Sequence, residues 1–159
     1  MTYYDKISSG YNELYEEEQI KKLNLIKSKI EIRKGLKLLD VGCGSGISSD
    51  FWCFVVGIDP SMELLRINNS KMKVLGVAEA LPFKDGSFDY VVSITSIHNF
   101  SDAGKSLNEM LRVGKNYFVF SVLRKSKGFN KIRKLFNDNL KIDDIIEEEK
   151  DTIFFCQKR

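Results

Sequence analysis

The sequence predicts an α/β fold, in which an open, mostly parallel sheet carries helices on both faces. Short apolar runs alternate with stretches of helical periodicity along the chain. A glycine-rich turn follows the first of these runs. The last two runs are separated only by "EKD", which predicts an antiparallel hairpin at one edge of the sheet. With 159 residues, the chain has the usual size of one domain, spanning residues 1–159.

The first half of the chain is expected to begin with a helix over residues 11–34, because Leu14, Leu23 and Ile30 recur at helical intervals. Gly35 ends this helix. The predicted strands that follow are "LKLLDV", "FVVGID", "KVLGVAEALPF" and "FDYVVSIT". Two predicted helices lie between them, "SGISSDFW" and "SMELLRINN".

Side chains are expected to face the sheet from both of these short helices. Phe51 and Trp52 are expected to pack the first one onto the sheet rather than to form a surface aromatic pair. Ser61 is expected to cap the second, with Leu64 and Leu65 facing inward.

The second half of the chain continues the alternation. "DAGKSLNEMLRV" and "NKIRKLFNDNL" are predicted helices on either side of the strand "NYFVFSVL". "KIDDIIEE" and "TIFFCQKR" form the closing hairpin. Neither an internal repeat nor a second domain is expected.

Composition excludes several classes of protein. Hydrophobic residues make up 43% and charged residues 30%, which indicates a globular rather than a disordered chain. No apolar run approaches the roughly 20 residues of a membrane span. The polar, acidic N-terminus is unlike a signal or transit peptide, so a cytoplasmic protein that does not enter a membrane is expected. Cys43, Cys53 and Cys156 lack C-x-x-C spacing, so neither a disulfide framework nor a metal site is expected.

The turn "DVGCGSG" has the chemistry of a nucleoside site. Its glycines run G-x-G-x-G rather than G-x-G-x-x-G, and no G-K-[ST] follows. Asp40 would repel a pyrophosphate but attract an ammonium. Asp59 ends the next strand, where a carboxylate can bind a ribose diol. These residues fit a nucleoside that carries an ammonium, a carboxylate and no phosphate, which is S-adenosylmethionine.

The segments "LLDVGCGSG", "VVGIDPSMELL", "AEALPFKDGSFDYVV" and "SITSIHNF" resemble those of class I S-adenosylmethionine-dependent methyltransferases of the type 11 group. The resemblance covers residues 3–123 and, more weakly, the hairpin. It implies a three-layer Rossmann-like methyltransferase fold and an enzyme that releases S-adenosylhomocysteine. Residues 1–34 would form a lid and helix, residues 35–123 the cofactor-binding core, and residues 124–159 a basic helix and the hairpin.

The resemblance also implies the cofactor contacts. Asp40, Gly42 and Gly44 would line the methionine end, with Cys43 contributing its backbone, and Gly46 would allow the chain to enter the helix. Asp59 would bind the ribose, Pro60 and Met62 would flank the adenine, and Ala78 would offer it an N–H. Ser93 would face the methyl group. Tyr3, Tyr4 and Tyr11 would belong to the lid.

Two departures from the family concern cofactor affinity. Relatives often carry an acidic residue where this chain has Val77, and Glu79 lies two residues further on and not at that place. The stretch between Gly46 and Asp59 is also short for the helix expected there.

Few residues are candidates for the chemistry at the acceptor. His98, the only histidine, would orient the acceptor or act as a weak base, or would only support its loop. Asn99 would hydrogen-bond an acceptor base or cap the loop. Cys43 is expected to matter through its backbone and not as a nucleophile.

The acceptor remains open between two classes. The short loops leave no room for a cap, and "RKSKGFNKIRK" is basic, which favours RNA; a solvated helix face is the alternative. The motifs are similar to those of rRNA guanine-N7 and tRNA wobble-uridine methyltransferases, which act with a small zinc-binding activator subunit. A small-molecule methyltransferase, such as one for quinone precursors and capped by a homodimer, is the rival. A non-catalytic cofactor-binding subunit is a further alternative.

Overall fold

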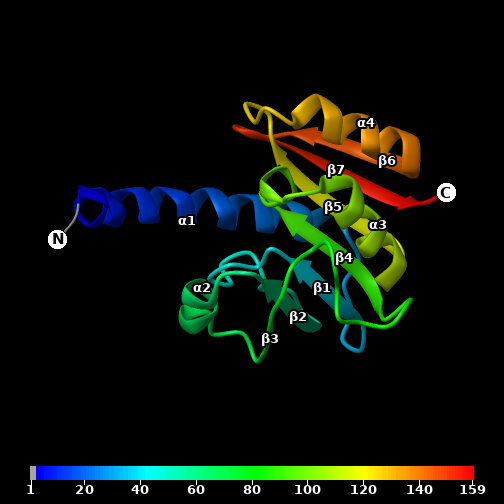
Figure 1. Cartoon of the computed structure of the whole chain (residues 1–159), viewed down its shortest axis with the longest axis horizontal. Coiled ribbons are helices and arrows are strands. Elements are labelled where there is room, and N and C mark those ends of the chain that lie inside the picture. The colour runs from blue at the N-terminus through cyan, green and yellow to red at the C-terminus, as the bar shows by residue number, and fades with distance from the viewer. Residues whose placement is uncertain (1–2) are drawn as a thin grey trace.

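The centre of the protein is a seven-stranded sheet in the order β3-β2-β1-β4-β5-β7-β6 (Figure 1). The computed structural model describes residues 3–159, with side chains from residue 13 onward. The strands are β1 Lys37–Val41, β2 Phe54–Asp59, β3 Met72–Leu75, β4 Phe88–Ile94, β5 Gly114–Leu123, β6 Leu140–Glu147 and β7 Asp151–Lys158. The first five are parallel, whereas β7 pairs antiparallel with β5 and β6. The predicted α/β fold and its closing hairpin are confirmed.

The chain changes direction in the sheet next to β1. It runs outward through β2 and β3 and then returns to the other side of β1 with β4. Ligands of open α/β sheets bind at such a switch point, beyond the carboxyl ends of the strands. The glycine turn, Asp59 and the end of β4 all lie at this edge.

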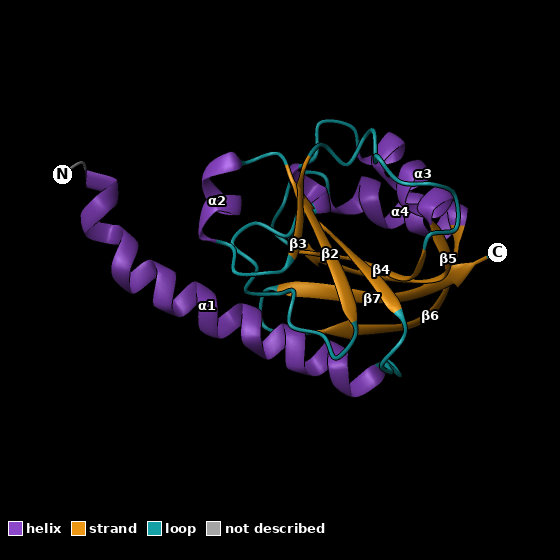
Figure 2. Cartoon of the chain, turned by 90° about the horizontal axis from the view of Figure 1, so that it is seen from below, coloured by secondary structure: helices purple, strands orange, loops and turns teal. Residues whose placement is uncertain are grey.

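Helices cover both faces of the sheet (Figure 2). The long helix α1, Tyr3–Lys29, lies on one face, and α3, Ala103–Val113, lies with α4, Phe129–Asn139, on the other. The short helix α2, Met62–Ile67, and the 3-10 turn η1, Ile97–Asn99, complete the structure. Ser61 caps α2 as predicted, since its side chain accepts a bond from the Leu64 N–H.

Each face has its own apolar core. Leu23 and Ile26 of α1 are buried against Leu38 of β1 and Val92 of β4. On the opposite face, the rings of β5 and α4 stack, with the centroids of Phe120 and Phe136 4.4 Å apart. Because α1 is anchored by its second half, its preceding turns can reach the carboxyl edge of the sheet.

The predicted helix over "SGISSDFW" is absent, and the chain forms successive turns there. Twelve residues, 42–53, separate β1 from β2, which is near the lower limit for a helical crossover. Trp52 is 68% exposed, with Lys27 over its ring, so its predicted packing is wrong, whereas Phe51 is buried.

Other element boundaries differ from prediction. α1 begins earlier and ends at Lys29 instead of residue 34. The third strand is only Met72–Leu75, because the chain leaves the sheet at Gly76. Leu64, predicted to face inward with the buried Leu65, is 41% exposed.

Candidate cofactor site

The glycine turn needs glycine for both its backbone and its space. Gly42, Gly44 and Gly46 have φ values of 81°, 51° and 86°, in the left-handed region that favours glycine. A Cβ at Gly42 would lie 2.6 Å from Cβ of Ser96, and one at Gly46 would lie 2.6 Å from Oδ1 of Asn68. The turn therefore fits tightly between the end of β4 and α2.

Asp59 holds the turn against the end of β2. Its Oδ2 accepts from the Gly44 N–H at 2.9 Å, and its Oδ1 accepts from the Ser61 N–H at 2.8 Å. A carboxylate has further lone pairs after two such bonds. Asp59 can therefore still accept bonds from a ligand hydroxyl at this edge.

Asp40 is fully buried beneath the turn. Its Oδ2 accepts from the Ser49 hydroxyl at 2.5 Å, whereas its Oδ1 has no hydrogen-bond partner among the described residues. The pKa of Asp40 is raised from 3.8 to about 7, chiefly by burial; the Ser49 bond opposes this shift, and the charge of Asp59 adds to it. An unpartnered buried carboxyl of this kind favours a cationic ligand group nearby.

A small cavity of about 150 Å³ opens on one side of the turn, between β2 and η1. It brings together several residues predicted from the sequence, namely Gly42, Pro60, Ala78, Glu79 and Asn99. Glu79 Oε1 also accepts from the Asp102 N–H at 3.2 Å, at the start of α3. Asn99, predicted at the acceptor, thus lies on the same cavity as the residues predicted at the adenine.

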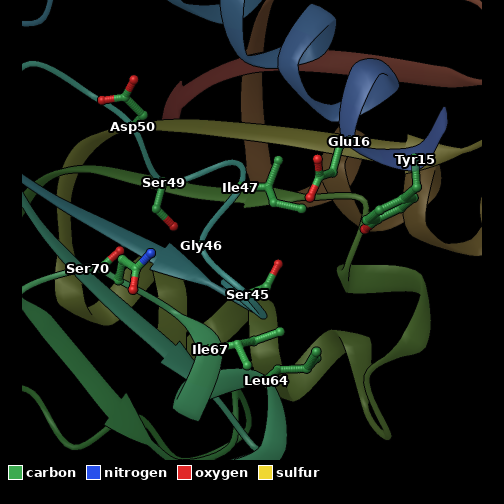
Figure 3. Close-up of a pocket in the computed structure, with 11 residues that line it drawn as sticks. Tyr15, Glu16, Ser45, Gly46, Ile47, Ser49, Asp50, Leu64, Ile67 and Ser70 are labelled. Atoms are coloured by element: carbon green, nitrogen blue, oxygen red, sulfur yellow. The ribbon is translucent and has the colours of Figure 1, made fainter. Parts of the chain in front are cut away.

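A larger cavity of about 790 Å³ lies on the other side of the turn. Figure 3 shows Tyr15 and Glu16 of α1 approaching it from one side, and Leu64 and Ile67 of α2 from the other. Sequence reasoning missed these four residues. The sequence signal that could have found Leu64 and Ile67 is that α2 carries apolar side chains outside the face that packs against the sheet.

Cys43 does not face either cavity with a reactive thiol. It is buried, its Sγ accepts from Asn68 Nδ2 at 3.6 Å, and it packs where a side chain on Gly57 would otherwise lie. Burial raises the pKa of the Cys43 thiol to about 12, with the charges of Asp40 and Asp59 adding to the effect. This thiol is not a nucleophile at neutral pH.

The end of β4 carries the remaining predicted residues. Ser93 is fully buried, and its Oγ has no partner among the described residues. His98 lies in η1, half-buried, and its Nδ1 likewise has no partner within the described part of the chain. Burial lowers the pKa of His98, and Lys22 lowers it further, while Asp151 raises it. The imidazole is therefore neutral at pH 7.

A third cavity, of about 450 Å³, lies beyond the carboxyl ends of β4 and β5. Its walls come from α1, Thr95, the end of β5 and the β6–β7 turn. Because it opens at the same edge of the sheet as the glycine turn, we name it the acceptor-side cavity.

Met62 and the three tyrosines of the predicted lid are the remaining predicted residues. Met62 is exposed at the first residue of α2. The side chains of Tyr3, Tyr4 and Tyr11 lie outside the described residues. From residue 13 onward, no three His, Cys, Asp or Glu side chains gather as metal ligands would. Among the described helices, none combines the length and apolar character that a membrane crossing requires.

The fold and the glycine turn are those of a class I S-adenosylmethionine-dependent methyltransferase domain. Residues 39–120 match the type 11 methyltransferase domain family, and the chain belongs to this family. The cofactor is therefore S-adenosylmethionine.

Three proteins that are similar in sequence to this chain carry different names. The chain is 34% identical over 125 residues to the uncharacterized protein MJ1252 of Methanocaldococcus jannaschii, covering 76% of this chain and 50% of that protein. It is 35% identical over 124 residues to the ubiquinone/menaquinone biosynthesis C-methyltransferase UbiE of Haemophilus ducreyi, covering 67% and 48%. A Dictyostelium discoideum protein named as a probable 18S rRNA (guanine-N7)-methyltransferase is 31% identical over 123 residues, covering 69% and 41%. The chain thus spans about half the length of these relatives, or less.

Solved structures share the fold at low identity. A chain of the complex between the Haloferax volcanii Trm112 methyltransferase activator and a methyltransferase superposes with a TM-score of 0.78 at 16% identity, covering 95% of both chains. The magnesium protoporphyrin IX methyltransferase of Synechocystis, solved with bound S-adenosylmethionine, gives 0.72 at 15% identity, covering 91% of this chain and 80% of that one.

Proposed function

We propose that this protein transfers the methyl group of S-adenosylmethionine to a base in RNA, either tRNA or rRNA. The observation that carries the proposal is a set of four exposed basic side chains that pair with no described residue and lie in the loop after β5 and the first half of α4. The choice of RNA rests on the charge of these side chains and on the short connections at the carboxyl edge of the sheet.

The residues of the turn fit the cofactor. The unpartnered Oδ1 of buried Asp40 suits its ammonium, and the spare lone pairs of Asp59 suit its ribose. Pro60 and Ala78 line the small cavity where its adenine would bind, and Gly42 leaves room for close approach. When bound, S-adenosylmethionine supplies a methyl group that its sulfonium has already activated.

The protein's own task is then to place the acceptor and exclude water. His98 is neutral at pH 7, because burial lowers its pKa, so it can orient an acceptor or accept a proton. Its position directly after β4 puts it at the same edge as the glycine turn. Asn99 adds a hydrogen-bonding amide there.

The basic stretch after β5 is only partly free for RNA. Arg124 donates to the carbonyls of Asp151 and Glu149, and Lys134 pairs with Asp138 at 2.7 Å. Four other side chains are exposed and make no hydrogen bond or ion pair with described residues: Lys125, Lys127, Lys131 and Arg133. They occupy the β5–α4 loop and the first half of α4, and Lys125 also lines the acceptor-side cavity. Such a group suits the phosphates of a polyanion.

The connections around this edge are short. Eight residues, 95–102, join β4 to α3, and five residues, 124–128, join β5 to α4. These connections insert no cap over the acceptor-side cavity. A large acceptor can therefore approach it.

A small-molecule acceptor is the second candidate. The acceptor-side cavity of about 450 Å³ lies within the usual range of small-molecule sites. The similarity to UbiE favours a quinone precursor or another metabolite. In that case a homodimer would supply the cover that the short loops lack.

A small activator subunit is the proposed partner if the acceptor is RNA. β3 is an edge strand that carries the exposed Met72 and Leu75, and Ile67 is exposed on α2. An unpaired edge with apolar side chains is a common site for a partner protein. The similarity to a chain of the Trm112 complex supports a partner of that kind.

Transfer of tritiated methyl groups tests the proposal. The wild type, with and without the candidate activator, is incubated with total RNA and, separately, with a metabolite extract. Labelled RNA is the expected product. The variant Lys131→Glu/Arg133→Glu should label RNA about tenfold more slowly, because it reverses two phosphate contacts.

The matched control is Arg33→Glu/Lys34→Glu, which makes the same charge change at the amino edge of the sheet and should keep the wild-type rate. Labelling of the metabolite extract instead of RNA would establish the small-molecule function. S-Adenosylhomocysteine binding with no transfer to either mixture would establish a non-catalytic subunit.

A further inference from the structure

A buried ion pair joins α1 to the start of β7, at the edge of the sheet that holds the cofactor turn. Nζ of Lys22 lies 3.2 Å from Oδ2 of Asp151, and the two side chains are 3% and 0% exposed. Lys22 also donates to Oγ1 of Thr95 at 3.0 Å. The pair therefore meets at the residue that directly follows β4.

Thr95 has an unusual backbone at this point. Its φ of 53° is the only left-handed value of a non-glycine residue in the described chain. For a β-branched residue this conformation is strained and persists only where its surroundings fix it. The strain marks Thr95 as a residue that its neighbours hold in place.

Several hydrogen bonds hold Thr95 in this conformation. Oγ1 of Thr95 donates to Oδ2 of Asp151 at 2.7 Å and also accepts from Nε2 of Gln19 at 3.4 Å. Its N–H donates to the Ser121 carbonyl at 3.0 Å. An apolar pair could tie α1 to the sheet as firmly as an ion pair does, but it could not supply these bonds to Thr95.

The turn at Thr95 determines where the next residue lies. Oγ of Ser96 donates to the Gly42 carbonyl at 3.1 Å and to the Ile94 carbonyl at 3.0 Å. Cβ of Ser96 occupies the space that a side chain on Gly42 would need. Thr95 and Ser96 thus connect the ion pair directly to the first glycine of the cofactor turn.

We propose that Lys22 and Asp151 are positioning residues of the cofactor site. They hold Thr95 in its left-handed conformation, which places Ser96 against Gly42 and sets the turn that receives the cofactor. The inference rests on the proposed location of the cofactor at this turn. It adds a function for α1, which reaches the turn through this network and also lines the cavity beside it.

Calorimetric titration with S-adenosylhomocysteine, together with thermal unfolding, tests the proposal without requiring an acceptor. Lys22→Met keeps the aliphatic stem and removes the charge. Its Kd should rise about tenfold, because Thr95 loses its bond from Lys22 and the buried Asp151 carboxylate loses the cation that pairs with it beside Thr95. Phe136→Leu is the matched control, because Phe136 of α4 lies in the core on the opposite face of the sheet from α1. It should lower the unfolding temperature and leave the Kd at the wild-type value.

A pair of substitutions at Thr95 separates positioning from packing. Thr95→Val keeps the shape and the strain but loses the hydroxyl, so its Kd should also rise about tenfold. Thr95→Gly loses the hydroxyl as well but adopts positive φ freely, so its Kd should stay within about threefold of wild type. A role in packing alone would make glycine the worse of the two.

Two results would overturn the proposal. In the first, Lys22→Met unfolds at a lower temperature but binds S-adenosylhomocysteine with the wild-type Kd. In the second, Thr95→Gly binds it more weakly than Thr95→Val does. If Lys22→Met does not fold, the Thr95 pair decides. If the wild type itself does not bind S-adenosylhomocysteine, the location of the cofactor fails as well, and that outcome is distinct from the other two.

Discussion

Replacing Asp40 by asparagine should change how the stability of the protein depends on pH. The Asp40 carboxyl is fully buried, and its pKa is raised from 3.8 to about 7, chiefly by burial. The folded state therefore holds a proton on Asp40 that the unfolded chain has already released between pH 4 and pH 7. Stability from this group is complete below pH 4 and is lost as the pH rises through 7.

The size of the effect follows from the pKa difference between the two states. A rise from 3.8 to about 7 corresponds to about 4 kcal/mol of unfolding free energy over the whole titration. Between pH 5 and pH 8 the loss should amount to about 3 kcal/mol. Asp40→Asn cannot ionise and keeps an oxygen for Ser49, so it should not show this loss.

Urea unfolding followed by circular dichroism at pH 5, 6, 7 and 8 measures the difference between the two proteins. The unfolding free energy of Asp40→Asn should exceed that of wild type increasingly as the pH rises. Asp89→Asn is the control: bonds from the Lys37 N–H and from Lys115 lower the pKa of that carboxyl, so it is ionised in both states over this pH range and its removal should shift the curve without changing its slope. Parallel curves for wild type and Asp40→Asn would refute the reasoning.

Three further predictions concern the site. Asp59→Ala removes the bonds from the Gly44 and Ser61 N–H groups and the proposed ribose contact. Calorimetry should therefore show at least about tenfold weaker S-adenosylhomocysteine binding, and an unchanged Kd would contradict the role of Asp59 in holding the ribose. Gly42→Ala should cost about 2 kcal/mol or more in urea unfolding, because φ is 81° and the methyl would lie 2.6 Å from Cβ of Ser96. Its control, Gly104→Ala in α3, should keep or gain up to about 1 kcal/mol. His98 is the only histidine, so its imidazole signals in proton NMR should titrate below pH 6.5, and a midpoint above that value would contradict the shift produced by its burial.

The strands and the glycine turn could be predicted from the sequence because their signals are local. Apolar runs bounded by turn residues located every strand, and the left-handed values of Gly42 and Gly46 agree with the residues found there. The prediction of a helix after the turn was wrong. The segment "SGISSDFW" has a plausible helical pattern, but too few residues remain before β2 for a helix to form. Local periodicity does not contain that length constraint.

The contacts around Thr95 could not be predicted, because they join distant parts of the chain. Lys22 reads as one of many lysines on an amphipathic helix, and Asp151 reads as the last residue of a hairpin turn. Only the sheet order, with β7 beside β5, brings them to the end of β4. A buried lysine has no distinct sequence signal until its partner is known.

The absence of a helix after the glycine turn changes how the amino-acid end of the cofactor can be held. The N–H groups of residues 42, 43, 44 and 46 all donate to acceptors within the protein. No helix dipole is added at this point, since the chain continues in turns. At the proposed location of the cofactor, electrostatic recognition of the methionine end would then depend largely on the carboxyl of Asp40, which accepts an ammonium only when ionised. Because its pKa is about 7, S-adenosylmethionine should bind more weakly at pH 6 than at pH 8 and should release a proton on binding at the lower pH.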